Sequence, residues 1–187
     1  MAQRAPAPAS YEEILALPRD RVGQIVRGVL HTHARPAPRH AAAATALSEE
    51  LGPPFKRGRG GPGGWWLLIE PELHLGADVL VPDLAGWRRD RMPEMPVDLP
   101  YFILSPDWLC EVLARSTAAL DRGDKLDAYA REGVGLVWFV DSEAQTLEVL
   151  RLDGATYRIV QHGSGASAVR AEPFDAIEID LALLWSR

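Results

Sequence analysis

The sequence predicts an α/β (α+β) fold in which a central mixed β-sheet is flanked by helices. Two observations predict it: short runs of apolar and β-branched residues recur along the chain, and two longer segments between them have the apolar spacing of helices. The chain of 187 residues is 47% hydrophobic and 25% charged, so it is long and apolar enough to bury its own core. We expect a single domain over residues 10–187, preceded by a flexible Ala/Pro-rich arm at residues 1–9.

The N-terminal third is expected to contain a short helix, two strands and a longer helix. Ser10 is a typical N-cap for the short helix. Residues 23–33 mix β-branched residues around Gly28, which predicts two strands joined by a turn. The Ala-rich segment 39–51 predicts the first core helix, and Gly52-Pro53-Pro54 is expected to stop it.

Residues 56–64, KRGRGGPGG, predict a flexible loop. Its Lys56, Arg57 and Arg59 could contact phosphate or could serve only as solubilising charges, and the sequence leaves both interpretations open. Residues 65–87 are rich in strand formers and predict two strands with a turn between them.

The C-terminal half is expected to alternate strands with one long helix. Residues 108–114, WLCEVLA, predict a buried strand after a Pro-rich connection at 88–100. The apolar spacing after Thr117 predicts the second core helix, which ends at Gly133. Three more strands are predicted, the last two as an antiparallel hairpin, and a strand and a short helix close the chain.

The bulk properties exclude several classes of protein. The one cysteine, Cys110, cannot form an intramolecular disulfide, and no apolar run has the length of a signal peptide or membrane span. We therefore expect a cytoplasmic protein that is neither secreted nor membrane-bound. The net charge is −6, yet residues 1–60 carry nine Lys or Arg and five Asp or Glu, against 11 and 21 in residues 61–187. This asymmetry indicates either a basic face for a phosphate backbone or scattered solvated side chains.

Three charged residues are hard to explain by packing alone. Asp83 follows Pro82 at a strand end, Glu111 lies within an apolar strand, and Lys125 lies on the following helix. A buried carboxylate is costly unless it is paired or bound to a cation. Two carboxylates on adjacent strands suit Mg²⁺, which leaves its other positions to water and phosphate oxygens. An ammonium nearby would balance charge and orient an attacking water.

Two segments resemble the motifs of a known family. Residues 81–91, VPDLAGWRRDR, look like its Pro-Asp motif, and residues 107–141 look like its signature of a Glu-Val strand, a Ser-Thr turn, Asp and Lys on a helix, and a Trp-containing strand. In this order and spacing the motifs resemble the DUF820/Uma2 family of restriction-endonuclease-like proteins, in the PD-(D/E)XK nuclease superfamily. The resemblance extends from about Tyr11 to Trp185.

The resemblance implies a restriction-endonuclease-like core and an endonuclease that uses Mg²⁺ or Mn²⁺ to hydrolyse DNA. It implies that Asp83 and Glu111 bind the metal ion, with the backbone carbonyl of Val112 as a further ligand and Lys125 as the catalytic lysine. The usual lysine position, two residues after the second acid, is Leu113 here, so the ammonium comes from the helix. Because nuclease cores that cut both strands commonly need two active sites, we expect a homodimer.

Three further residues are candidates for supporting roles. Glu70, in the strand before Asp83, is either an additional acidic ligand or a strand-edge carboxylate in water. Asp121 lies one helical turn before Lys125 and is expected to pair with it at i,i+4. His40 opens the first core helix, where it either contacts the site or serves only as a polar residue at the helix start.

Two departures from the family pattern favour an alternative. Gln24 replaces an expected acid, which removes one negative charge from the site. Arg115 replaces a residue of the Ser-Pro-Ser-Thr turn and is expected to place a cation close to Glu111, where it binds phosphate or neutralises the site. The alternative is a catalytically degenerate nuclease fold that acts as a DNA-binding or protein-interaction module. A structural oligomer subunit that binds no nucleic acid is a third hypothesis.

Overall fold

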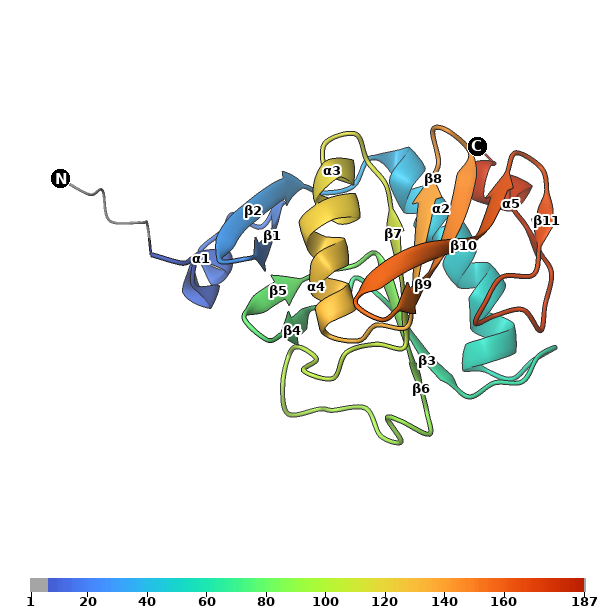
Figure 1. Cartoon of the computed structure of the whole chain (residues 1–187), viewed down its shortest axis with the longest axis horizontal. Helices are drawn as coiled ribbons and strands as arrows, with labels where there is room; N and C mark the ends of the chain where they lie inside the picture. The colour runs from blue at the N-terminus through green and yellow to red at the C-terminus, as the bar shows by residue number, and fades with distance from the viewer. Residues whose placement is uncertain (1–6, 187) are drawn as a thin grey trace.

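A six-stranded mixed sheet forms the centre of the molecule (Figure 1). The computed structural model describes residues 7–186, so residues 1–6 of the expected arm lie outside the described residues. The strand order is β10-β9-β8-β7-β6-β3, with β7 and β8 parallel and all other neighbours antiparallel. This confirms the predicted fold class. The strands are β3 (Trp65–Ile69), β6 (Leu84–Arg88), β7 (Trp108–Val112), β8 (Leu136–Asp141), β9 (Thr146–Asp153) and β10 (Thr156–Ser164).

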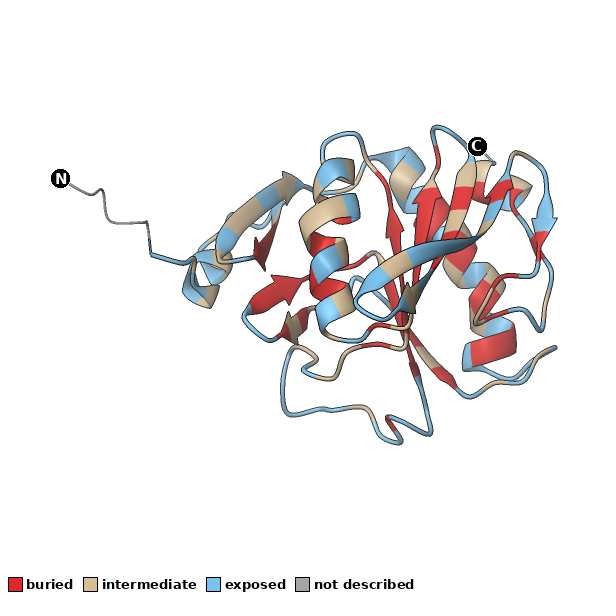
Figure 2. Cartoon of the chain, in the orientation of Figure 1, coloured by how far each residue is buried: buried red, intermediate tan, exposed pale blue. Residues whose placement is uncertain are grey.

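Helices cover both faces of this sheet. One face carries α2 (Pro38–Leu51) and α5 (Ala182–Trp185), and the other carries α3 (Ala118–Leu120), the π-helical turn η2 (Asp121–Lys125) and α4 (Leu126–Arg131). The side chains of β7 alternate between the two layers: Trp108, Cys110 and Val112 pack with α2, and Leu109 packs with α4. Glu111 therefore lies on the α4 face, in a strand that is buried along its whole length (Figure 2).

A four-stranded antiparallel sheet lies beside the first, on the same side of the molecule as α1 (Tyr11–Leu15) (Figure 1). Its order is β2-β1-β5-β4, with β1 (Arg21–Val26), β2 (Val29–Ala34), β4 (Leu73–Leu75) and β5 (Asp78–Leu80). The predicted turn at Gly28 is confirmed, since Gly28 has φ 74° and connects β1 to β2. The short strands β11 (Ala168–Val169) and β12 (Ile179–Asp180) pair near the C-terminus.

The prediction of two strands over residues 65–87 is wrong, because this segment forms four: β3, β4, β5 and β6. Proline lacks the N–H group that a strand ladder requires, and Pro71 and Pro82 both lie between strands. Glu70 has φ 47°, which ends β3. The chain therefore leaves the large sheet after β3, contributes the β4–β5 hairpin to the small sheet, and returns at Asp83.

Both core helices form near the predicted positions but differ in detail. The helical structure does not end at Gly52, because α2 continues into the π-helical turn η1 (Gly52–Lys56). The two prolines lie in the first turn of η1, where their missing N–H groups cost least. The second core helix contains the π-helical turn η2, with non-helical torsion angles at Gly123. Asp121 and Lys125, at the two ends of η2, are both buried. None of the described helices is long and apolar enough to cross a membrane.

Candidate active site

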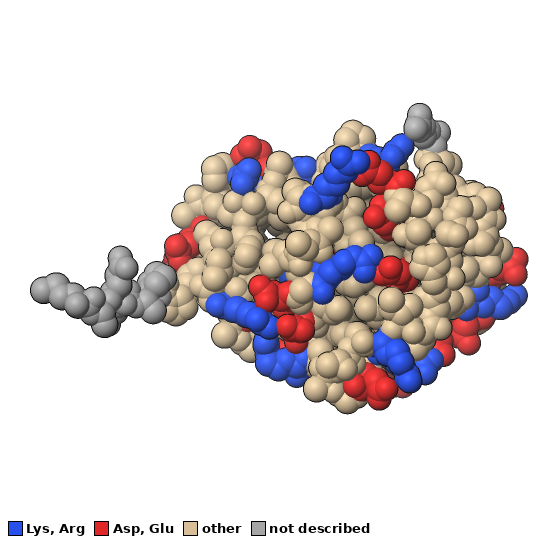
Figure 3. All heavy atoms as spheres, turned by 45° about the horizontal axis from the view of Figure 1, so that its top comes forward, with Lys and Arg blue, Asp and Glu red and all other residues tan. Residues whose placement is uncertain are grey.

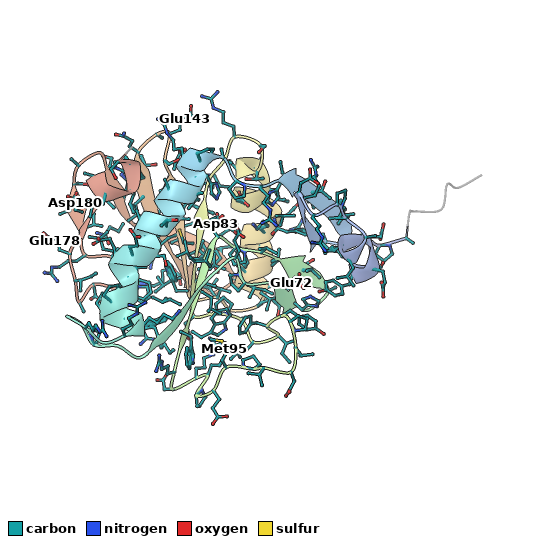
Figure 4. All side chains as sticks on the ribbon, turned by 180° about the vertical axis from the view of Figure 1, so that it is seen from behind. Glu72, Asp83, Met95, Glu143, Glu178 and Asp180 are labelled. Carbon is teal, nitrogen blue, oxygen red and sulfur yellow. The ribbon has the colours of Figure 1, made fainter. Side chains whose placement is uncertain are left out.

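A cavity of about 230 Å³ lies where β6 begins and β7 ends. Leu84 pairs with Cys110 between these strands, so Asp83 and Glu111 follow at the next register position. Figure 4 shows Asp83 between α2 and the helical layer of α3 and α4. The cavity brings together most of the residues singled out from the sequence: Gln24, His40, Glu70, Asp83, Glu111, Val112, Asp121 and Lys125.

The Asp83 carboxylate is held from two sides. Its Oδ1 lies 2.6 Å from Nε2 of His40, in the first turn of α2. Its Oδ2 accepts a 2.7 Å hydrogen bond from the backbone N–H of Val112 on β7. The side chains of Asp83 and His40 are 15% and 14% exposed, so both remain accessible from the cavity. A helix start and a strand end therefore fix the orientation of this carboxylate.

Glu111 and Asp121 share one ammonium. Nζ of Lys125 lies 2.7 Å from Oε1 of Glu111 and 2.9 Å from Oδ1 of Asp121, the predicted i,i+4 pair. The hydroxyl of Tyr129 donates a 2.6 Å hydrogen bond to the same Oε1. The Lys125 and Glu111 side chains are only 2% and 3% exposed. One cation between two acids leaves a negative charge in excess when both acids are ionised.

Burial and the neighbouring charges set the protonation of this cluster. Burial raises the pKa of the Glu111 carboxyl, and the Lys125 ammonium only partly offsets that effect. Burial alone would lower the pKa of Lys125, but the carboxylates of Glu111 and Asp121 outweigh it and raise the pKa. Burial, followed by Glu111, also raises the pKa of the Tyr129 hydroxyl. Lys125 is therefore a fixed positive charge rather than a general base.

Glu70 and Gln24 both line the cavity, but Glu70 is exposed and Gln24 is buried. Glu70 is exposed and lies just beyond β3 rather than within it, and its N–H donates to the Asp83 carbonyl oxygen at 2.9 Å. Gln24 is buried on β1, where its Oε1 accepts the N–H of Val81 at 2.9 Å. Gln24 therefore secures β1 to the chain before Asp83, and Glu70 presents a carboxylate at the cavity rim.

Arg115 does not join the cavity. Its Nε donates a 2.8 Å hydrogen bond to Glu143, and its side chain is 86% exposed. Figure 4 shows Glu143 well away from Asp83, at the edge of the molecule. The expectation that Arg115 places a cation close to Glu111 is not met, because the guanidinium turns outward to the β8–β9 turn.

The Uma2 family model, described as "Putative restriction endonuclease", matches residues 10–183. The chain belongs to the Uma2 family. The crystal structure of "a putative nuclease belonging to DUF820" from Anabaena variabilis ATCC 29413 is similar in fold, with a TM-score of 0.76 and 18% sequence identity over 95% of this chain and 98% of that chain. No curated protein matches the chain. The resemblance inferred from residues 81–91 and 107–141 is thus confirmed, as is the nuclease-like fold.

The oxygen donors of this Uma2 site suit a hard cation. Mg²⁺ needs only one or two protein carboxylates, because water and phosphate oxygens complete its coordination shell. Within residues 7–186, no group of three or more His, Cys, Asp and Glu side chains is arranged to hold a metal ion. The pair Asp83 and Glu111 therefore fits an ion that shares its coordination with a phosphate. It does not fit an ion that requires a complete protein cage.

One member of the Uma2 site was not predicted from the sequence. The sequence indicates no role in the site for Tyr129, yet its hydroxyl contacts Glu111. Its position in the sequence could have indicated this contact. Asp121, Lys125 and Tyr129 are spaced at i,i+4 and so lie along one face of the helix.

Proposed function

We propose that this chain is a metal-dependent endonuclease that hydrolyses phosphodiester bonds in DNA. The observation that supports the proposal is the convergence of Asp83, Glu111 and Lys125 on one cavity from β6, β7 and η2. A buried carboxylate such as Glu111 beside a fixed ammonium is costly to maintain, and the partly exposed Asp83 carboxylate lies on the adjacent strand end. Membership in a family described as "Putative restriction endonuclease" supports DNA as the proposed substrate class.

Each residue has a distinct part in the proposal. Asp83 and Glu111 would hold Mg²⁺ or Mn²⁺, with the backbone carbonyl of Val112 as an additional ligand, and the Glu70 carboxylate at the cavity rim would contact the ion through a water molecule. The bound ion would stabilise the charge that develops on the phosphate oxygens. Lys125, positioned by Asp121, would orient the attacking water. His40 would keep the Asp83 carboxylate turned toward the cavity.

A specific observation favours a second candidate, a degenerate nuclease fold that binds DNA or protein without cleavage. Lys125 already compensates Glu111 and Asp121, and His40 already contacts Asp83. Gln24 contributes an amide at a position where the family resemblance leads us to expect an acid. These internal partners would stabilise the cluster without any metal ion.

The deciding experiment combines calorimetry of Mg²⁺ and Mn²⁺ binding with plasmid nicking on the same samples. Wild type is compared with Asp83→Asn and Glu111→Gln, and with the matched surface variants Asp175→Asn and Glu143→Gln. Under the proposal, binding and nicking occur in wild type and in both surface variants and fall in the two site variants. A wild type that binds no divalent ion at millimolar concentration would favour the degenerate fold instead.

Because nuclease cores that cut both strands of a duplex commonly need two active sites, we also propose that the chain acts as a homodimer. Light scattering of the purified protein gives the mass directly. A monomer that linearises plasmid without dimerising on DNA would contradict this part of the proposal.

A further inference from the structure

We propose that a second surface, separate from the cavity, binds the phosphate backbone of duplex DNA. This surface, the basic edge, consists of Lys56, Arg57, Arg59, Arg88 and Arg89, all of them exposed. The proposal concerns binding alone and does not depend on cleavage at the cavity.

The fold brings together two segments that lie about 30 residues apart in the sequence. Trp65 pairs with Arg88 at the end of the β3–β6 ladder, and the N–H of Arg89 donates to the Gly64 carbonyl at 2.9 Å. The Arg89 guanidinium also donates to the Lys56 carbonyl at 3.1 Å. The loop after Lys56 folds back on η1, since the N–H of Arg59 donates to the Pro53 carbonyl at 2.8 Å.

The charge of the basic edge is not neutralised by carboxylates. Lys56 donates to the Leu67 carbonyl at 3.1 Å and Arg89 to the Trp65 carbonyl at 3.3 Å, while the Arg88 guanidinium lies over the Trp65 ring at 4.7 Å. A carbonyl or an aromatic ring leaves the positive charge in place. Within residues 7–186, no member of the basic edge is in ion-pair contact with an acid. By contrast, seven arginines elsewhere form such pairs: Arg27, Arg91, Arg115, Arg122, Arg131, Arg151 and Arg158.

Outside the basic edge, seven of the twelve described arginines form ion pairs with acids. On the face shown in Figure 3, basic side chains mostly lie beside acidic ones. A protein with net charge −6 that leaves five cations unpaired in one place has concentrated its positive potential there. Unpaired Lys and Arg clusters are what a phosphate backbone requires.

The basic edge also has a concave surface. A hollow of about 340 Å³ beside η1 is lined by Ser48, Lys56 and Arg57, with Glu49 as its one acid. Within the described residues, the guanidinium groups of Arg57 and Arg59 make no hydrogen bond to protein, so no internal contact accounts for them. A phosphate group would provide both with an acceptor.

The distance between the cavity and the basic edge fits a duplex. α2 and η1 run from His40 at the cavity to Lys56, 16 residues further on, which is about 24 Å at about 1.5 Å per residue. Figures 1 and 4 show α2 as a straight helix along this flank. B-form DNA covers that length in about seven base pairs. Of the exposed residues on α2 between the two sites, Ala41, Ala42 and Thr45 are small and uncharged, and Glu49 is an acid. A duplex with one phosphate at the cavity would therefore reach the basic edge with another.

The test is fluorescence anisotropy with a labelled 20-base-pair duplex in EDTA, measured over a range of salt concentrations. The variant is Arg57→Gln/Arg59→Gln/Arg88→Gln, which leaves Lys56 and Arg89 in their structural contacts. The matched control, Arg19→Gln/Arg158→Gln/Arg170→Gln, removes the same charge from exposed positions elsewhere. Thermal unfolding of each variant verifies that it is folded.

We expect the basic-edge variant to bind at least tenfold more weakly than wild type at low salt. Its slope of log affinity against log salt should be smaller by about two to three, because up to three phosphate contacts are lost. The control should keep the wild-type slope. A six-base-pair duplex cannot span both sites and should bind wild type more weakly than the 20-base-pair duplex does. Equal losses in variant and control, or no binding by wild type, would overturn the proposal. Wild-type binding without metal-dependent nicking would refute the proposed catalysis and leave the basic edge standing.

Discussion

The ammonium nitrogen of Lys125 lies 2.7 Å from Oε1 of Glu111, with both side chains almost completely removed from solvent. Each of these buried charges is stabilised by the other, because neither is hydrated. Breaking a buried pair by removing one partner costs far more than the pair contributes, because the remaining charge has no water around it. The stability of the fold and the chemistry of the cavity are therefore coupled at this contact.

Lys125→Met should lower the free energy of unfolding by roughly 3–5 kcal/mol, because it leaves Glu111 and Asp121 buried without a cation. Urea unfolding at pH 7 measures the loss. Adding Glu111→Gln to Lys125→Met should recover part of it. The chain's other lysine gives the matched control: Lys56→Met, at an exposed position, should cost much less. Equal midpoints for Lys125→Met and wild type would contradict the ion-pair interpretation.

His40→Ala tests whether the contact with Asp83 serves the proposed metal site. His40 Nε2 lies 2.6 Å from Oδ1 of Asp83, so its loss removes one of the two contacts that orient the carboxylate. Groups that orient a metal ligand commonly contribute 10- to 100-fold to metal affinity or activity. We expect the Mg²⁺ concentration for half-maximal nicking to rise by about that factor, while His162→Ala, at an exposed site on β10, leaves it unchanged. An unaltered Mg²⁺ requirement in His40→Ala would remove His40 from the site.

The sequence predicts the centre of the site better than its periphery. Glu111 stands out because a carboxylate inside an apolar strand conflicts with the local pattern, and Asp121 follows from helical spacing. Arg115 could not be placed in this way, because its direction depends on Glu143, which lies 28 residues later. The ion-pair partner of a long side chain on a surface turn depends on which residues the tertiary structure places nearby.

The same distinction holds for the fold. The strands of β7, β8 and the β9–β10 hairpin follow from local periodicity, and all were predicted. The division of residues 65–87 into four strands was not, because it depends on β5 pairing with β1, and β4 with β5, in a second sheet. Pro71 lies where the chain leaves the large sheet, and Pro82 lies where it leaves the small one. The prolines alone do not indicate which sheet contains the strands between them.

Arg115→Ala should leave metal-dependent nicking unchanged, because its guanidinium pairs with Glu143 at the surface rather than with Glu111. An exposed pair of this kind contributes little to stability. The unfolding midpoint in urea should match that of wild type, and Glu143→Ala should behave in the same way. A large loss of nicking in Arg115→Ala alone would restore this residue to the site as a phosphate contact.

Tyr11→Phe should weaken the attachment of α1 in a pH-dependent way. The Tyr11 hydroxyl donates a 2.7 Å hydrogen bond to Glu72, and this bond, together with burial, raises the pKa of Tyr11 to about 12. Because the neutral phenol is the donor, its contribution is complete below the ordinary pKa of 10 and disappears as the pH rises through about 12. Hydrogen exchange of the β1 amides, on which α1 packs, should therefore be faster in Tyr11→Phe than in wild type near pH 8. Spectrophotometric titration should show one late-titrating tyrosine fewer in the variant. Loss of a phenol that titrates near its ordinary pKa of 10 would instead mean that Tyr11 ionises as an ordinary exposed phenol and that Glu72 does not hold the helix.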